Sequence, residues 1–380
     1  MIPEMQTRLT AIEIDLDALL HNFLTIQRHV APALVMPIVK DNAYGHGIIS
    51  CARHLEKNGA QWLGVALLEE GILLRKAGIS VPLVVLGGIL GRQIIHFIEH
   101  DLDITAASIM KLEAIEDQAR SMGKRARVHL EIDTGMERTG VHYYTAHTFI
   151  ERTARTAWCD IVGVFSHFAT AESADCTFAS TQLDRFLESI KLFEKYGMPL
   201  PLRHISASGS ILQLPKAHLD IVRPGLLLYG IAPAHHLYAV LDLRPVMSLR
   251  SRVVYFKVVK AGTGVGYGLS WVSAQDTRVV TVPIGYGDGY SRAFARHGHV
   301  LIRGKRYPII GSICMDQFMV DIGTDEVYND DEVVLIGAQG SETITIQEVT
   351  ARVVEGNVRE TMTGLNMRIP RIYTTLTKQL

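Results

Sequence analysis

Short apolar runs alternate with amphipathic stretches along the first two thirds of the chain. The apolar runs are rich in valine, isoleucine and leucine, which is typical of buried strands. They lie at residues 33–40, 62–67, 82–89, 103–107, 127–135, 161–169, 203–208 and 219–225. The spacing between them predicts helices, for example over residues 107–123 and 181–197, and each of these two ends in a glycine. Eight strands that alternate with helices predict an α/β fold, a parallel (β/α)₈ barrel of the TIM type.

The pattern changes after about residue 234. From residue 249 onward, β-type runs follow one another with glycine turns between them, which predicts a mostly-β domain. These runs lie at residues 249–259, 277–285, 299–304, 307–313, 317–323 and 332–337. Residues 342–356 are expected to add a short helix. We therefore predict a barrel domain at 10–238 and a C-terminal β domain at 239–380, which residues 1–9 are expected to join.

Composition and charge narrow the classes of partner. The 380 residues carry a net charge of −1, which leaves no basic surface for nucleic acid or an anionic membrane. The four cysteines are scattered and form no CxxC pair, so the sequence predicts neither a zinc site nor a disulfide framework. The absence of a signal-like N-terminus and of a long apolar run leads us to expect a cytoplasmic protein.

Polar residues stand where the predicted barrel strands end. Catalytic groups of such barrels lie at the C-terminal ends of the strands and in the loops that follow. This rule selects Lys40, Tyr44, Arg138, His167, His204, Ser208 and Arg223. More polar groups meet at this mouth of the barrel than solvation requires, so we expect a site there.

Position in the sequence alone leaves two possible roles open for Lys40, and two others for Arg223. Lys40 is either a rim lysine with its ammonium in water or a partly desolvated amine that forms a Schiff base with an aldehyde cofactor or carbonyl substrate. Arg223 faces either a neighbouring strand or a ligand. Ser208 and the backbone at Gly225 could cradle a phosphate at the end of the seventh and eighth strands.

The glycines around Tyr267 do not form a nucleotide-binding loop. The segment "GTGVGYGLSW" fits G-x-G-x-x-G in no frame and lies in an all-β region. We expect β-turns that expose Tyr267.

Taken together, the motifs resemble the alanine racemase family over nearly the whole chain. They are "VKDNAYGHG", "DTGMERTG", "SHFATAES", "VRPGLLLYG", "GVGYG", "PIGYGDGYSR", "CMDQFMVD" and "RIPRIY", in this order. The resemblance implies a pyridoxal 5′-phosphate (PLP) enzyme with a barrel and a β domain. It also implies a head-to-tail homodimer in which both chains contribute to each active site.

The family's site residues carry over to matching positions of this sequence. Lys40 matches the lysine that holds PLP, and Arg223 matches the arginine that faces the pyridine nitrogen. Residues that match phosphate contacts are Tyr44, Ser208, Gly225 and Leu226. Residues that match substrate contacts are Arg138 and, from the partner subunit, Met315 and Asp316. His167 matches the histidine that links Arg223 to Tyr267 of the partner subunit.

The resemblance implies that L- and D-alanine are interconverted by two bases. Racemisation removes the Cα proton and returns one to the opposite face, so Lys40 serves one face and Tyr267 of the partner subunit the other. Free tyrosine has a pKa of about 10, so Tyr267 needs the cationic chain of Arg223 and His167 beside it. The product D-alanine would supply peptidoglycan synthesis.

Three positions depart from the family pattern. Many relatives have a carbamylated lysine where this chain has Glu131, and we hypothesise that Glu131 supplies the same negative charge to orient Arg138. Ala207 replaces a frequent asparagine, and Met367 stands where some relatives have a tyrosine that touches the phosphate. These changes put a strict preference for alanine in doubt.

Three rival functions follow. The nearest is a racemase that acts on serine or on a broader set of amino acids. The second is a PLP-dependent basic amino-acid decarboxylase, which expects a carboxylate in place of Arg223. The third is a non-catalytic PLP-binding protein, which would lack the β domain that carries Tyr267.

Overall fold

The computed structural model describes residues 7–295 and 297–375. Contacts divide the chain into two compact units, each described by itself below. The barrel unit comprises Ala18–Ala43 and Ile48–Pro245, and the C-terminal unit comprises Met1–Asp17, Tyr44–Gly47 and Val246–Leu380. The predicted domain limits, 10–238 and 239–380, stay a prediction.

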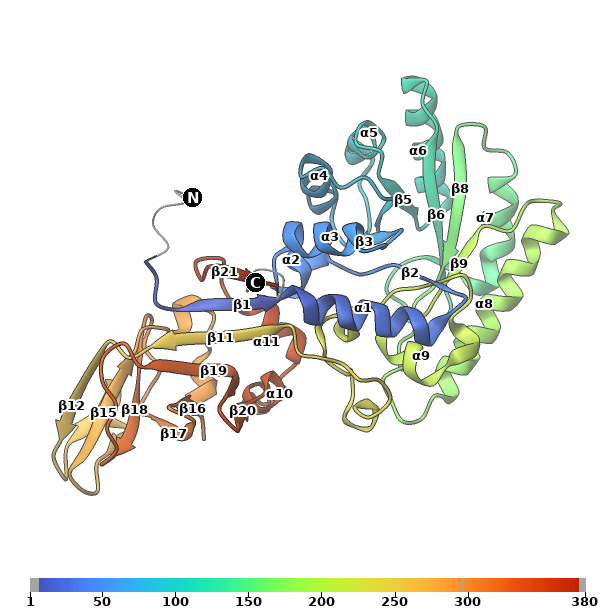
Figure 1. Ribbon diagram of the computed structural model, residues 1–380. Coiled ribbons are helices and arrows are strands. Elements are labelled where there is room, and N and C mark those ends of the chain that lie inside the picture. The colour runs from blue at the N-terminus through green and yellow to red at the C-terminus, as the bar shows by residue number, and fades with distance from the viewer. Residues whose placement is uncertain (1–6, 296, 376–380) are drawn as a thin grey trace. The chain divides into compact units, whose positions relative to one another are not determined.

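The barrel unit is built on eight parallel strands with helices beside them, most of which are labelled in Figure 1. Six of them form one sheet in the order β3 (Leu63–Val65), β4 (Leu83–Val85), β5 (Asp103–Ala106), β6 (Ala126–Asp133), β8 (Cys159–Phe165) and β9 (Leu202–His204). The other two, β2 (Leu34–Val35) and β10 (Ile221–Val222), pair with each other. Bridges from Ile38 to Gly64 and from Ala207 to Arg223 join the two sheets. These bridges close the ring, so the predicted (β/α)₈ barrel is confirmed.

The barrel strands are shorter than the apolar runs that predicted them. Of the run 33–40, only Leu34–Val35 is a regular strand, because Pro37 has no N–H to donate to a ladder and the chain turns away at Lys40. The predicted helices are confirmed as α6 (Ile109–Met122) and α8 (Thr177–Lys195). The other α-helices up to residue 245 are α1 (Leu16–Val30), α3 (Ile48–Lys57), α4 (Leu68–Lys76), α5 (Ile94–Glu99), α7 (Ala146–Thr153) and α9 (Ser208–Gln213), whereas the segment labelled α2 (Lys40–Tyr44) is a left-handed turn. A short strand β7 (Val141–His142) pairs with β6.

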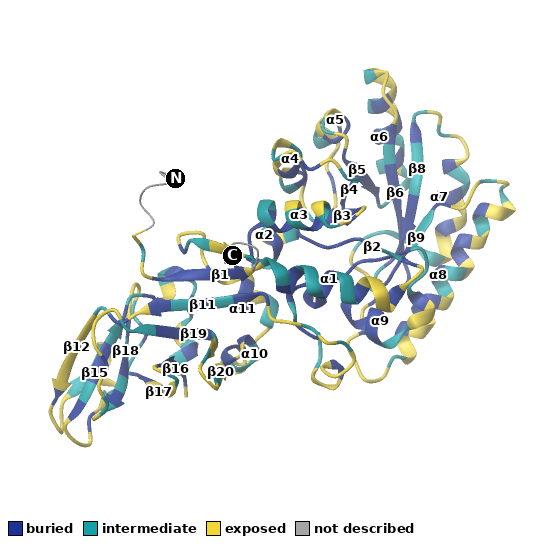
Figure 2. Ribbon diagram, viewed as in Figure 1, coloured by how far each residue is buried: buried dark blue, intermediate teal, exposed yellow. Residues whose placement is uncertain are grey.

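The strands of the barrel unit are mostly buried, whereas its helices carry many exposed residues (Figure 2). Every residue of β3, β4 and β5 is buried, as expected for parallel strands covered on both faces. In the long helices α6 and α8 the buried residues recur at helical spacing, so one side of each is covered. Among the helices of residues 7–295 and 297–375, none is long and apolar enough to cross a bilayer.

The C-terminal unit is built on one ten-stranded sheet. Its main order is β12 (Tyr255–Val259), β15 (Thr277–Val282), β18 (Phe318–Gly323), β17 (Lys305–Ile310), β16 (His299–Ile302), β19 (Glu332–Gln339), β11 (Met247–Arg252), β1 (Ala11–Asp15) and β21 (Arg371–Thr374). Strand β20 (Glu342–Ile344) pairs with β19, and two short helices follow, α10 (Ile346–Thr350) and α11 (Val358–Gly364). In β18 buried and half-buried residues alternate, which is the pattern of a sheet with one covered face. The mostly-β C-terminal domain is confirmed, and α10 is the short helix expected within 342–356.

One expected strand was wrong. The run 249–259 contains two strands, β11 and β12, which are far apart in the sheet order. Between them, the Val253 amide donates to Asp331 beside β19, whereas the Val254 amide donates to Thr281 of β15. The chain therefore changes partner strand at this point. Continuous β-propensity does not reveal such a change.

Candidate active site

Lys40 opens a left-handed turn at the end of the first barrel strand. The residues Asp41, Asn42, Ala43 and Tyr44 all have φ between 52° and 55°. A left-handed conformation costs about 1–2 kcal/mol for each non-glycine residue, so this turn must be held by its surroundings. The Lys40 side chain is 40% exposed, and its Nζ lies 3.9 Å from Asp41 Oδ2. The amine therefore reaches open space at the barrel mouth.

Glu70 holds this turn. One carboxylate oxygen, Oε1, accepts a hydrogen bond from the Asp41 amide at 2.6 Å. The other, Oε2, accepts from the amides of Ala66 and Leu67 at the start of α4. Sequence reasoning missed Glu70, although a glutamate three residues after a helix N-cap is a recognisable signal. Its effect on the lysine turn could not be seen without the fold.

The strand ends that carry Lys40 and Arg223 are neighbours. The Met36 amide donates to the Val222 carbonyl at 2.8 Å, and the Ile38 amide donates to the Pro224 carbonyl at 3.0 Å. Lys40 and Arg223 thus leave the barrel at adjacent strands.

Arg223 is a buried cation with its terminal nitrogens fully engaged. Its residue exposure is 4%, and Nη1 donates to His204 Nδ1 at 2.7 Å. Nη2 donates to the Ser166 carbonyl at 2.8 Å and to His167 Nδ1 at 3.1 Å. Burial lowers the pKa of Arg223 to about 10, and the Glu131 carboxylate opposes this. Among the described residues, none accepts from the Nε–H, so this donor is left for a ligand.

The contact with Arg223 sets the tautomer of His167. Because a guanidinium can only donate, Nδ1 of His167 accepts, and the neutral ring carries its proton on Nε2.

A buried glutamine positions His167, and sequence reasoning missed it too. Gln182 of α8 donates to the His167 carbonyl at 3.1 Å and accepts from the Ala169 amide at 2.9 Å. Its position on the buried face of a predicted helix is the one signal that could have marked it, since buried polar side chains require partners.

Ser208 has the geometry of a phosphate contact. The amides of Gly225 and Leu227 donate to its Oγ, at 3.1 Å and 3.4 Å. With these bonds occupying the lone pairs, the hydroxyl hydrogen is left to donate to an anion. Leu226 lies in the same segment and is buried, at the start of a short 3₁₀ turn. Ser208, Gly225 and Leu226 therefore form one backbone-lined cradle.

The buried carboxyl group of Glu131 has a raised pKa. The residue is 4% exposed and lines a small cavity, about 10 Å³, with Arg138, Ser166 and His167. Burial raises the pKa of Glu131 to about 7, against the opposing charges of Arg138 and Arg223. Arg138 itself is exposed. The carboxyl is therefore only partly ionised near neutral pH.

The other predicted site residues belong to the C-terminal unit. Tyr267 stands at the tip of a small hairpin between β13 (Gly264–Val265) and β14 (Trp271–Val272), and it is 75% exposed. Gly266 and Gly268 beside it have φ of 75° and 72°, so the turn relies on glycine. The expected exposed tyrosine on a glycine turn is confirmed.

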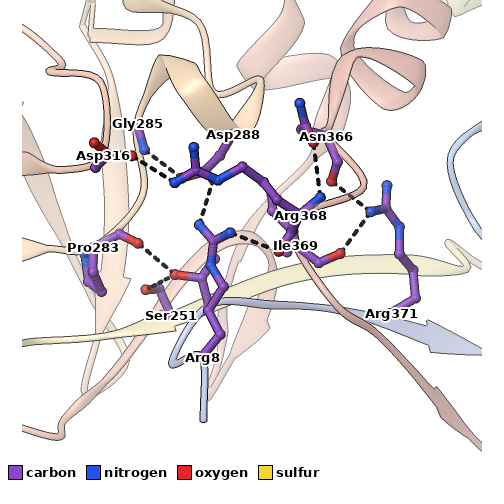
Figure 3. A network of polar contacts seen from close by, with 11 residues as sticks. Arg8, Ser251, Pro283, Gly285, Asp288, Asp316, Asn366, Arg368, Ile369 and Arg371 are labelled. Carbon is purple, nitrogen blue, oxygen red and sulfur yellow. Dashed lines mark hydrogen bonds and ion pairs between the residues drawn. The ribbon is translucent and has the colours of Figure 1, made fainter. Parts of the chain in front are cut away.

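Met315 and Asp316 are exposed on a loop that a network of arginines supports (Figure 3). Arg368 donates to Asp316 at 2.7 Å and also pairs with the buried Asp288 at 2.9 Å. Arg8 pairs with the same Asp288 oxygen at 2.6 Å. The Met315 carbonyl accepts from Gly287. The loop is therefore fixed on its own unit, with its side chains outward.

The structure thus sorts the predicted residues into two groups. The barrel mouth carries Lys40, Glu131, Arg138, His167, Ser208, Arg223, Gly225 and Leu226. The C-terminal unit carries Tyr44, Tyr267, Met315 and Asp316. Tyr44 is half-buried, and its carbonyl contacts the ring of His46 at 3.0 Å.

The barrel-mouth donors suit PLP. The Ser208 hydroxyl offers a donor for a phosphate, the Nε–H of Arg223 offers one for a pyridine nitrogen, and Lys40 offers an amine for an aldehyde. The chemistry of this donor set fits the cofactor that the resemblance implies.

Comparisons with known proteins cover nearly the whole chain. The family models "Alanine racemase, N-terminal domain" and "Alanine racemase, C-terminal domain" match residues 14–233 and 246–373. A protein named alanine racemase 2 from Caldanaerobacter subterraneus subsp. tengcongensis is 39% identical over 371 residues, covering 97% of this chain and 95% of that one. The solved alanine racemase of Clostridium difficile 630 superposes with a TM-score of 0.91 at 32% identity, covering 97% of this chain and 96% of that one. A histidine racemase of Leuconostoc mesenteroides subsp. sake superposes with a TM-score of 0.87 at 27% identity, covering 97% and 99%.

Proposed function

The chain belongs to the alanine racemase family, and from this premise we propose that it interconverts L- and D-alanine with PLP as its cofactor. The observation that carries the proposal is the buried Arg223, whose two terminal nitrogens are held by protein acceptors beside the strand end of Lys40. A cation fixed in this way presents a donor that cannot easily give up its proton. This suits a pyridine nitrogen that stays unprotonated.

Each barrel-mouth group has a defined part in holding the cofactor. Lys40 would bind it through its amine. Ser208, held by the backbone at Gly225, would bind the phosphate together with the backbone at Leu226. Tyr44 would add a phosphate contact. When bound, PLP delocalises the negative charge left on Cα of the amino acid after proton removal.

Two residues move the proton. The Lys40 amine, once free of the cofactor, takes or returns the Cα proton on one face. The phenol of Tyr267 of the partner subunit does the same on the other face. His167, whose Nδ1 accepts from Arg223, would link this phenol to Arg223 by donating to the tyrosine oxygen through its other ring nitrogen. A donor at that oxygen favours the phenolate.

Arg138 would bind the substrate carboxylate, and Glu131 would orient Arg138. The exposure of Arg138 allows it to reach a ligand, and the Glu131 carboxyl lines the same cavity. Met315 and Asp316 of the partner subunit would complete the substrate pocket.

A mixed dimer tests the proposal directly. If active sites are shared, the Lys40→Ala and Tyr267→Ala homodimers are both inactive. Co-refolding or co-expressing the two variants then yields a heterodimer with one intact site, made of Lys40 from one chain and Tyr267 from the other. Alanine racemisation followed by circular dichroism should return only in the mixture. Failure of the mixture to regain activity, with the heterodimer isolated by two affinity tags, would refute the shared site.

A broader substrate range is a second candidate. Met367 is 62% exposed where some relatives have a tyrosine, and a structural neighbour is named a histidine racemase. Assays with both enantiomers of alanine, serine and lysine separate a strict from a broad enzyme. A decarboxylase is disfavoured by Arg223, and a non-catalytic PLP-binding protein by the match to the C-terminal family model. A cytoplasmic location and a supply of D-alanine to peptidoglycan complete the proposal.

A further inference from the structure

A buried hydrogen-bonded chain runs from Arg223 into the barrel interior. Nη1 of Arg223 donates to His204 Nδ1 at 2.7 Å. Nε2 of His204 lies 2.9 Å from His129 Nδ1, and Nε2 of His129 lies 3.2 Å from Asp103 Oδ2. All four residues are at most 4% exposed. The chain is therefore shielded from water along its length.

This hydrogen-bonded chain connects the two ends of the barrel. Arg223 follows β10, and His204 is the last residue of β9, so both lie at the mouth. His129 is in the middle of β6, and Asp103 is the first residue of β5 at the opposite end. There Arg127 binds Asp103 through two bonds of 2.6 Å and 3.1 Å.

The two ends dictate the same proton arrangement. Arg223 can only donate, so Nδ1 of His204 must accept, and its proton is on Nε2. That proton is donated to His129 Nδ1, so the proton of His129 is on Nε2 and faces the Asp103 carboxylate. An ionised carboxylate can only accept, and it completes the series. Every histidine nitrogen in the chain has one permitted role.

The surroundings keep both rings in place and His204 neutral. The ring of His204 stacks on Phe165 at 4.9 Å with 7° between planes. A Cβ atom at Gly163 would lie 2.1 Å from His129 Nδ1, so this glycine leaves room for the ring. Burial, then Arg223 and then His129 lower the pKa of His204 well below its usual value. Burial tends to raise the pKa of Asp103, but hydrogen bonds from His129 and Arg127 outweigh it and hold the pKa below normal.

We propose that Asp103, acting through His129, is a remote positioning residue that fixes the tautomer of His204 and thereby the orientation of the Arg223 guanidinium. The consequence for catalysis rests on the proposed function, in which Arg223 faces the cofactor. The proton arrangement itself does not depend on it. Asp103 touches neither substrate nor cofactor, and its effect passes through the imidazole tautomers.

The substitution Asp103→Asn should reverse the direction of the hydrogen bonds that link Asp103, His129 and His204. The shorter of the two Arg127 bonds, 2.6 Å from Nε, goes to Oδ1, so we expect the amide oxygen at that position and the amide NH₂ at the Oδ2 position that faces His129. Nε2 of His129 then becomes an acceptor, and its proton moves to Nδ1 and faces His204. Nδ1 of His204 in turn carries a proton against Nη1 of Arg223. Two donors cannot share this contact, so the guanidinium must shift.

Nitrogen-15 NMR of histidine-labelled protein tests the tautomers without activity. In the cofactor-free wild type we expect both His129 and His204 as neutral Nε2–H tautomers, and in Asp103→Asn both as Nδ1–H tautomers. The control Arg127→Gln keeps the carboxylate, so its tautomers should match those of the wild type. A wild-type His204 that carries a proton on Nδ1 overturns the proposal, and this measurement decides even if Asp103→Asn does not fold. Unchanged tautomers in a folded Asp103→Asn overturn it as well.

The holoenzyme supplies a second readout. The exchange of Asp for Asn behind a catalytic histidine traps the wrong tautomer and costs about 10⁴-fold in kcat in serine proteases. Across two histidines we expect a smaller loss, about 10²-fold in kcat, with KM for alanine little changed, and near wild-type kinetics for Arg127→Gln. Equal kinetics of Asp103→Asn and wild type would contradict the positioning role. If the tautomers are as expected but the wild type binds no PLP, the proposed function fails while the proton arrangement stands.

Discussion

Replacing Glu131 by glutamine removes a buried carboxyl group at nearly constant size. Burial raises the pKa of Glu131 from 4.5 to about 7. The native protein therefore binds more protons than the unfolded chain between these pH values, and the free energy of unfolding falls as the pH rises through this window. Each pKa unit corresponds to about 1.4 kcal/mol, so the loss amounts to about 3 kcal/mol above pH 7. Glu131→Gln has no such carboxyl group and should not show this loss. The free energy of unfolding of the variant, relative to that of the wild type, should therefore rise by about 3 kcal/mol from acidic to alkaline pH.

Urea unfolding of both proteins, in steps from about pH 5 to about pH 8, measures this difference. Glu188→Gln is a matched control, because Glu188 is a surface carboxylate whose side chain is 74% exposed. The control should follow the wild type at every pH. A constant difference between Glu131→Gln and the wild type over this range would show that Glu131 titrates as an ordinary carboxyl, which contradicts its assigned burial.

The same variant tests the proposed role of the charge. If Glu131 orients Arg138, its loss should raise KM for alanine about tenfold at alkaline pH, where the wild-type carboxylate is ionised, and less at acidic pH. Kinetics of Glu131→Gln that equal those of the wild type throughout would mean that Arg138 needs no such partner.

Three further variants address the rest of the barrel mouth. Lys40→Ala should lose the visible absorbance band of lysine-bound PLP that the wild type shows; a spectrum without bound cofactor in both proteins would refute the PLP assignment. Ser208→Ala removes a hydrogen bond to the phosphate, which is worth about 1–3 kcal/mol, and should weaken PLP binding about 5- to 150-fold in a fluorescence titration. An unchanged affinity contradicts the cradle. Glu70→Ala frees the left-handed turn after Lys40 and should cost about 1–3 kcal/mol, seen as a lower Tm, with Glu69→Ala as the neighbouring control; equal Tm values for the two would show that Glu70 does not hold the turn.

The chain pattern predicted the architecture and most of the site because both are local in sequence. Hydrophobic runs of strand length separated by helices define a (β/α)₈ barrel, and its strand ends identify where polar groups such as Lys40, Ser208 and Arg223 gather. Glycines around Tyr267 predicted an exposed tyrosine on a turn, since that conformation requires glycine. These features depend on a residue's own neighbours along the chain.

Only the tertiary structure decided how these residues are held. Glu70 is 29 residues from Asp41, and Gln182 is 15 residues from His167, so no spacing rule links them. The split of residues 249–259 into two strands depends on which distant strands donate and accept. The hydrogen bonds from Arg223 to Asp103 join residues in or directly after four different strands, β5, β6, β9 and β10. Their proton arrangement follows from donor and acceptor contacts that exist only once the barrel is closed. Sequence pattern determines which face of an element is buried, whereas the pairing of buried polar groups is settled by contacts between distant parts of the chain.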